Sequence, residues 1–89
     1  MKVLVICRPR PGVERADIAA HASAEMDALR ELRAEGALVE AYSPGGPGAI
    51  LVINAERERV DGIVGSLPLI RGGLVEPEVI ELHPFAGLA

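Results

Sequence analysis

Residues 38–53, LVEAYSPGGPGAILVI, decide the fold, because two apolar runs are separated here by a segment that can only turn. The prolines and glycines of residues 43–48 exclude a helix and an interior strand. Leu38–Tyr42 and Ala49–Ile53, on either side, have the apolar and β-branched character that is typical of strands. The sequence therefore predicts a β-hairpin in the middle of the chain.

On the N-terminal side of this hairpin, residues 14–35 are predicted to form one helix. Its apolar residues recur at three- and four-residue steps, and Gly36 follows as a C-terminal stop. A continuous apolar run, Val3–Cys7, precedes the helix and is predicted to be a strand. Two prolines and a glycine in residues 8–12 end that strand.

On the C-terminal side, a second helix is predicted, with Asn54 as its N-cap and Pro68 as its end. Residues 69–74 are expected to form a connector. Glu78–Leu82 is predicted to be the last strand, and a short tail follows it through Phe85.

The predicted order is β-α-β-β-α-β, the split βαβ arrangement of ferredoxin-like folds. We therefore expect one α+β domain over residues 1–89, a four-stranded antiparallel sheet with two helices on one face. Right-handed crossovers place the first and third strands in the middle. Both of these strands are apolar at every position, although two helices cover only one face. A second copy packed on the other face, giving a homodimer or an oligomer of dimers, is the prediction; a modest exposed patch is the alternative.

Composition excludes several classes of function. The chain has 89 residues, of which 49% are hydrophobic, and a net charge of −4. An acidic chain with 2% aromatic residues suits neither phosphate backbones nor a base-stacking platform, so no nucleic-acid partner is expected. No run approaches the roughly 20 apolar residues of a membrane span. The single cysteine, Cys7, cannot form an internal disulfide, and we expect an inert core thiol in a cytoplasmic protein.

The spacing of cysteine and histidine matches no zinc site, and no glycine-rich phosphate-binding motif joins a strand to a helix. We therefore expect no metal and no cofactor.

Two residues of the first predicted helix are candidates for catalysis. At about 100° per residue, Glu25 falls near the middle of the apolar face, and His21 lies toward its edge, one turn earlier. A carboxylate at a sheet-facing position is unusual unless its desolvation is compensated. The two side chains could then donate and accept a proton. An ion pair on the helix surface, with Glu25 tilted into water, is an equally open interpretation.

Four further residues are candidates for substrate binding. Tyr42 could orient a ligand, or simply anchor its ring with a wet hydroxyl. Arg8 and Arg71 could hold a substrate carboxylate, or be solvated loop charges. His83, at the end of the last predicted strand, could bind substrate or only cap and pack.

Several short motifs together resemble those of the muconolactone isomerase family. They are His21 with Glu25, residues 66–69 (SLPL) after the second helix, and residues 82–84 (LHP) after the last strand. The resemblance implies proton-transfer isomerisation of a small lactone or carboxylate-bearing metabolite, with His21 and Glu25 as the proton-transferring pair. The aromatic and basic residues of that family's second strand are replaced here by Leu38, Val39 and Glu40.

The chain also resembles the YCII-related family, in its helix histidine, His21, and in residues 68–75 (PLIRGGLV). In that family the histidine acts with an aspartate before the proline, a position held here by Leu67. Both families belong to the dimeric α+β barrel superfamily, in which two ferredoxin-like subunits pair their sheets. The resemblance leaves two further interpretations open: a non-catalytic small-molecule-binding or accessory domain, and a cofactor-free polyketide oxygenase.

Overall fold

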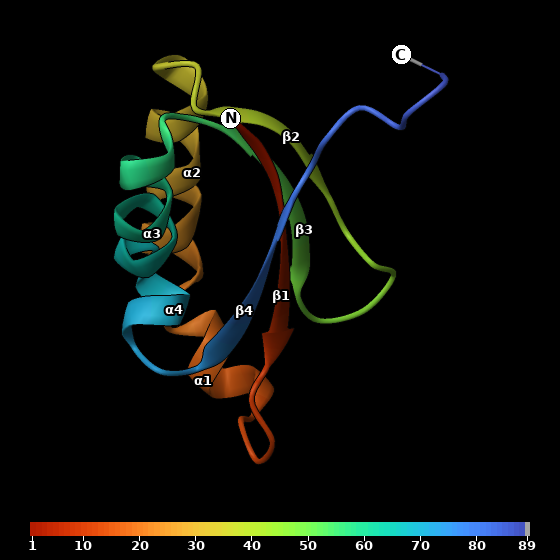
Figure 1. The fold of residues 1–89 in the computed structure, drawn as a ribbon. Helices are drawn as coiled ribbons and strands as arrows, with labels where there is room; N and C mark the ends of the chain where they lie inside the picture. The colour runs from red at the N-terminus through yellow and green to blue at the C-terminus, as the bar shows by residue number, and fades with distance from the viewer. Residues whose placement is uncertain (89) are drawn as a thin grey trace.

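The computed structural model describes residues 1–88 as an α+β fold with a helix layer on one side of a single sheet (Figure 1). In chain order the elements are β1 (Lys2–Pro9), α1 (Arg15–Ala19), α2 (Ala22–Ala34), β2 (Leu38–Tyr42), β3 (Ala49–Asn54), α3 (Arg57–Ser66), α4 (Pro68–Arg71) and β4 (Val75–Glu81). No helix within residues 1–88 has the length and apolar character that crossing a membrane requires.

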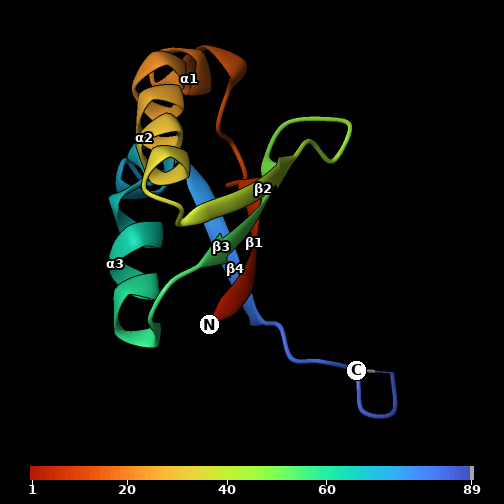
Figure 2. The ribbon, with the colours of Figure 1, turned by 90° about the horizontal axis from the view of Figure 1, so that it is seen from above.

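The sheet has the strand order β2-β3-β1-β4, and each neighbouring pair is antiparallel. The predicted hairpin is therefore confirmed as β2 and β3, and the predicted central strands are confirmed as β1 and β3. All the helices lie on the same side of the sheet, as two perpendicular views agree (Figure 2). The ferredoxin-like fold predicted from the sequence is confirmed.

The core lies between the sheet and the helices. Val3 and Val5 of β1 pair with Ile53 and Leu51 of β3, and all four side chains are almost completely buried. Val60, Ile63 and Val64 of α3 close the core from the other side. Alternation along β1 explains this arrangement, because successive side chains point to opposite faces of a sheet.

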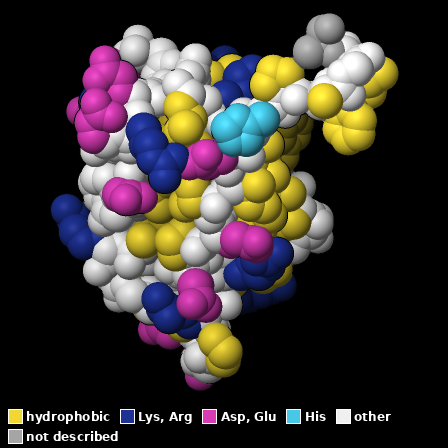
Figure 3. Space-filling view, viewed as in Figure 1, with side chains coloured by type: hydrophobic (Ala, Val, Ile, Leu, Met, Phe, Trp, Pro, Cys, Tyr) yellow, Lys and Arg dark blue, Asp and Glu magenta, His cyan; other side chains and the backbone are white. Residues whose placement is uncertain are grey.

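The opposite face of the sheet carries no helix in residues 1–88 (Figure 2). Leu4 and Ile6 of β1 lie on this open face, with Val52 and Ile50 as their partners on β3. Ile80 of β4 pairs with Leu4 and is 38% exposed. Apolar side chains reach the surface over the strands, with charged side chains among them (Figure 3). The face predicted to lack cover within one copy thus combines an apolar centre with charged margins.

The prediction of a single helix over residues 14–35 is wrong, because the helix is interrupted before α2. The Asp17 carbonyl would accept the backbone N–H of His21 in a continuous helix. Instead, the imidazole Nδ1 of His21 lies 3.1 Å from that oxygen, and the His21 N–H bonds to the carbonyl of Ile18. A side chain that enters the hydrogen-bond ladder in this way breaks or bends a helix.

The predicted helix cap, connector and last strand also differ from the structure. Asn54 does not cap a helix, because it is the last residue of β3 and its N–H bonds to the carbonyl of Ala37; Glu56 is the N-cap of α3 instead. Pro68 ends α3 as predicted, but it also begins α4, since proline suits the first turn of a helix. The last strand begins at Val75 and tolerates Pro77 because β4 is an edge strand.

Candidate functional site

The interruption between α1 and α2 fixes the orientation of His21, the N-cap of α2. A carbonyl oxygen can only accept, so the imidazole Nδ1 donates its hydrogen to the Asp17 carbonyl, 3.1 Å away. In the neutral ring the proton therefore resides on Nδ1, and Nε2 carries a free lone pair. Nε2 of the half-buried His21 can therefore accept a proton when the ring is neutral.

Glu25, in the first turn of α2, is also half-buried and is held by a different helix. Its Oε1 accepts a hydrogen bond of 3.0 Å from the backbone N–H of Leu69 in α4. That N–H belongs to a first helical turn and has no partner inside its own helix. The carboxylate therefore faces the helix layer, which favours the interior position over the tilt into water.

No ion pair within residues 1–88 joins His21 to Glu25, although a spacing of one helical turn brings the two side chains close enough to touch. The reason is that His21 reaches back to the carbonyl of Asp17, whereas Glu25 reaches forward to the amide of Leu69. The two groups share one helical turn, in which the N–H of Glu25 bonds to the carbonyl of His21. Each group therefore has its own hydrogen-bond partner, and the two do not neutralise each other.

The pKa of Cys7, which lies in β1, depends in part on the charge of Glu25. Its thiol is buried on the helix-facing side of β1. Burial, and to a smaller extent the negative charge of Glu25, raise the pKa of Cys7 to about 11. The thiol is therefore protonated at neutral pH, as expected for an inert core cysteine.

A mainly apolar hollow of about 340 Å³ opens beside α1, and its size is within the usual range of small-molecule sites. It is lined by Pro9, Val13, Arg15, Ile18, Ala19 and Pro47. Arg15 forms no ion pair with any of residues 1–88. Sequence analysis missed Arg15; the available signal was a cation in the first helical turn after a proline- and glycine-rich loop.

Two predicted binding residues lie on the other side of the sheet. Arg8 alternates with the buried Cys7 and forms a 2.9 Å ion pair with Glu78. Tyr42 pairs with Ile50 of the open face, and its hydroxyl donates to Glu40, which raises the pKa of the phenol. The structure therefore separates Arg8 and Tyr42 from His21 and Glu25 by the thickness of the sheet.

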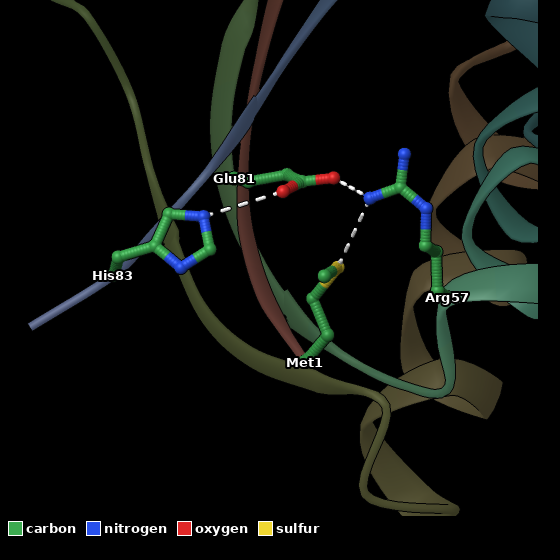
Figure 4. Close-up of polar contacts among 4 residues, drawn as sticks. All are labelled: Met1, Arg57, Glu81 and His83. Carbon is green, nitrogen blue, oxygen red and sulfur yellow. Dashed lines mark hydrogen bonds and ion pairs between the residues drawn. The ribbon is translucent and has the colours of Figure 1, made fainter.

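His83 lies beyond β4, in a polar cluster shown in Figure 4. Its Nε2 is 3.3 Å from a carboxylate oxygen of Glu81, and the other oxygen of Glu81 pairs with Arg57. Arg57, Glu81 and Met1 line a hollow of about 450 Å³ between α3 and the edge of the sheet. His83 thus belongs to a different region from His21.

Arg71 remains close to the candidate pair. It is the last residue of α4, whose second residue, Leu69, holds Glu25. It is exposed and forms no ion pair with any of residues 1–88. Across these same residues, no three His, Cys, Asp or Glu side chains come together in a way that could hold a metal ion.

No protein-family model matches the chain. A curated protein, the aldehyde dehydrogenase tropH of Talaromyces stipitatus, is 50% identical to it over 46 residues. This match covers 49% of the chain but only 9% of the dehydrogenase, so it is local.

Among solved structures, the chain is similar to 5-chloro-2-hydroxyhydroquinone dehydrochlorinase of Burkholderia phenoliruptrix, in complex with 2,5-dihydroxybenzoquinone. The TM-score is 0.73 and the sequence identity 22%, over 93% of this chain and 94% of that one. Near-complete coverage of both chains at this score shows a common fold. The likeness confirms the predicted ferredoxin-like α+β fold.

Proposed function

We propose that this chain is a small enzyme that moves a proton on a small cyclic carbonyl compound and needs no cofactor. The observation that carries this proposal is the state of His21. Its Nδ1 donates to the Asp17 carbonyl, so its Nε2 carries a free lone pair. The Glu25 carboxylate belongs to a residue one helical turn away. Positioned groups of this kind typically contribute about 10²–10⁴-fold to a proton-transfer rate.

The chemistry is a shift of a proton and a double bond. Nε2 of His21 takes a proton from the carbon next to the carbonyl, and the electron pair moves into an enolate. The imidazolium returns the proton at another carbon, so that the reaction is an isomerisation with no net gain or loss of atoms. The Glu25 carboxylate stabilises the imidazolium by its negative charge.

The proposed substrate class rests on two cations, one at the hollow beside α1 and one on α4, the helix that holds Glu25. Arg15 at the hollow beside α1 and Arg71 at the end of α4 have no carboxylate partner within residues 1–88. A guanidinium binds a carboxylate by two parallel hydrogen bonds. We therefore propose an anionic substrate, a small lactone or cyclic enone that carries a carboxylate.

A second candidate is the elimination of hydrogen halide from a halogenated hydroxyquinol. It is supported by the structural neighbour, a dehydrochlorinase whose bound molecule is a dihydroxybenzoquinone. Both candidates require a base to remove a proton from a small ring, and they differ in whether a halide leaves afterwards.

The alternative from another class is a non-catalytic domain that binds a small molecule. It is favoured by Leu67, which replaces the aspartate of the YCII-related pair, and by the local match to a segment of a much larger enzyme. A cofactor-free oxygenase is a further alternative, and it predicts uptake of oxygen with a quinol substrate.

A second copy of the chain is the partner we propose for the open face of the sheet. Leu4, Ile6 and Ile80 would be buried between two sheets. Arg8 and Tyr42 would then lie at the contact between the two copies, where they could bind substrate only at a site built by both. The oligomeric state, measured by sedimentation, tests this arrangement.

The function is tested in deuterated water with a panel of lactone carboxylates, cyclic enones and chlorinated hydroxyquinols. Proton NMR detects deuterium entering the substrate and its conversion, and an ion-selective electrode detects chloride. Conversion by the native chain that His21→Gln abolishes and His83→Gln leaves unchanged supports the proposal. Binding of a panel member without exchange or conversion would establish the non-catalytic domain instead.

A further inference from the structure

Gly72, which follows α4, is a glycine that its backbone does not require. Its φ of −75° and ψ of −3° belong to the right-handed helical region, which any residue adopts. The next residue, Gly73, differs, because its φ of +75° lies in the left-handed region that favours glycine. The turn after α4 therefore accounts for Gly73 and leaves Gly72 to be explained.

The space around Gly72 supplies that explanation. A Cβ at this position would lie 3.6 Å from Nε2 of His21 and 3.9 Å from its Cδ2. These atoms form the edge of the imidazole that carries the free lone pair. A Cβ would also lie 3.0 Å from the carbonyl oxygen of Pro68, so that oxygen must move by a few tenths of an ångström to admit alanine. Any side chain at position 72 would thus rest against the proposed base.

We propose that Gly72 is a specificity-determining residue that keeps one approach to Nε2 of His21 open. The inference rests on the proposed function, in which Nε2 removes a proton from a small ring. A bare Cα offers a flat surface over which a planar ring can slide to bring its C–H bond to the nitrogen. Planar cyclic substrates are accordingly admitted, and a bulkier residue at position 72 would restrict them by size.

The test measures the access to Nε2 separately from catalysis. Diethyl pyrocarbonate acylates the free nitrogen of a neutral imidazole, and mass spectrometry of tryptic peptides distinguishes His21 from His83. We expect His21 to react about threefold more slowly in Gly72→Ala and at least about tenfold more slowly in Gly72→Leu. His83, which lies in a different region, should react at the native rate in both variants.

Gly65→Ala is the matched control, since a Cβ at Gly65 in α3 meets nothing within 4 Å and should leave the His21 rate unchanged. Circular dichroism and urea unfolding establish that each variant is folded. If leucine prevents folding, the alanine variant carries the test, because its Cβ requires only a small shift. An unchanged His21 rate in folded Gly72→Ala, with leucine either unfolded or also unchanged, overturns the inference.

Activity separates this inference from the proposed function. With a substrate that the native chain converts, Gly72→Ala should raise KM more for wide rings than for narrow ones. If the native chain converts nothing but His21 is protected in the Gly72 variants, the function is wrong and the role of Gly72 in access to Nε2 stands. If conversion depends on His21 but its acylation does not depend on residue 72, only the present inference is wrong.

Discussion

The two histidines stand in similar sequence settings and very different structural ones. His21 precedes Glu25 by four residues, and His83 follows Glu81 by two. His83 is exposed, and it contacts the carboxylate of Glu81, which also pairs with Arg57 at the surface. His21 is half-buried, gives its Nδ1 hydrogen to a backbone carbonyl, and keeps Nε2 free. In this chain, the candidate base is the histidine whose Nδ1 is held by a backbone carbonyl, and the histidine that contacts a carboxylate is a surface group.

The largest expected effect is on turnover. His21→Gln should lower kcat/KM by about 10²–10⁴-fold, because the amide cannot accept the proton. His83→Gln should change it by less than about twofold, since surface changes away from a site have small effects. Steady-state kinetics with a substrate found in the panel provide the measurement. Equal losses in the two variants would contradict the distinction between the histidines.

The next effect is a loss of folding stability at alkaline pH. The pKa of Cys7 is about 11 in the folded chain, against an ordinary value of 9.0, so the unfolded chain loses this proton first as the pH rises. The contribution to stability is complete below pH 9 and is lost between pH 9 and 11, at most about 3 kcal/mol. Urea unfolding across this range should show a steeper decline for the native chain than for Cys7→Ala. Parallel declines would exclude the raised pKa.

The pKa of Cys7 should respond differently to substitution of Glu25 and of Glu81. Glu25→Gln should lower the pKa of Cys7, because the charge of Glu25 contributes to raising it, whereas Glu81→Gln should leave it unchanged. The ultraviolet absorbance of the thiolate follows the titration. A pKa that does not respond to Glu25→Gln would place that carboxylate away from β1.

A smaller difference is expected in stability at neutral pH. Glu25→Ala leaves the amide of Leu69 without its partner and should cost about 1–3 kcal/mol. Glu81→Ala removes an ion pair at the surface and should cost less than about 1 kcal/mol. Urea unfolding at pH 7 measures both. A cost for Glu81→Ala that equals or exceeds that for Glu25→Ala would be the opposite of this ranking.

The smallest effect is expected at the exposed histidine itself. His83→Ala should change the free energy of unfolding by less than about 0.5 kcal/mol, because its contact with Glu81 is exposed. Urea unfolding at pH 7 gives the measurement. A cost of several kcal/mol would show that His83 is structurally important.

The strand order could be predicted from the sequence because the apolar runs are short, continuous and separated by proline and glycine. The break before α2 could not, because Ala20 and His21 are compatible with a helix; it results from one hydrogen bond to Asp17. That Glu25 lies near the sheet followed from helical periodicity. Its bond to Leu69 could not be foreseen, because it depends on α4, which was expected to be a connector.

The positions of the candidate binding residues could not be predicted from the sequence either. Arg8 and Tyr42 stand at strand ends in the sequence, but the face on which a strand residue lies depends on register. Arg15 was missed because its neighbours at the hollow, such as Pro47, are distant in sequence. Short-range patterns thus predicted the elements, and only tertiary packing showed which side chains meet.

The tautomer of His21 decides whether Nε2 can act as a base. Two-bond ¹H–¹⁵N correlation NMR of the imidazole side chains, at a pH where both rings are neutral, reports which nitrogen of each histidine carries the proton. We predict the Nδ1–H form for His21, because its Nδ1 donates to the Asp17 carbonyl. The Nε2–H form at His21 would leave Nε2 without a free lone pair, and His21 could then not be the proposed base.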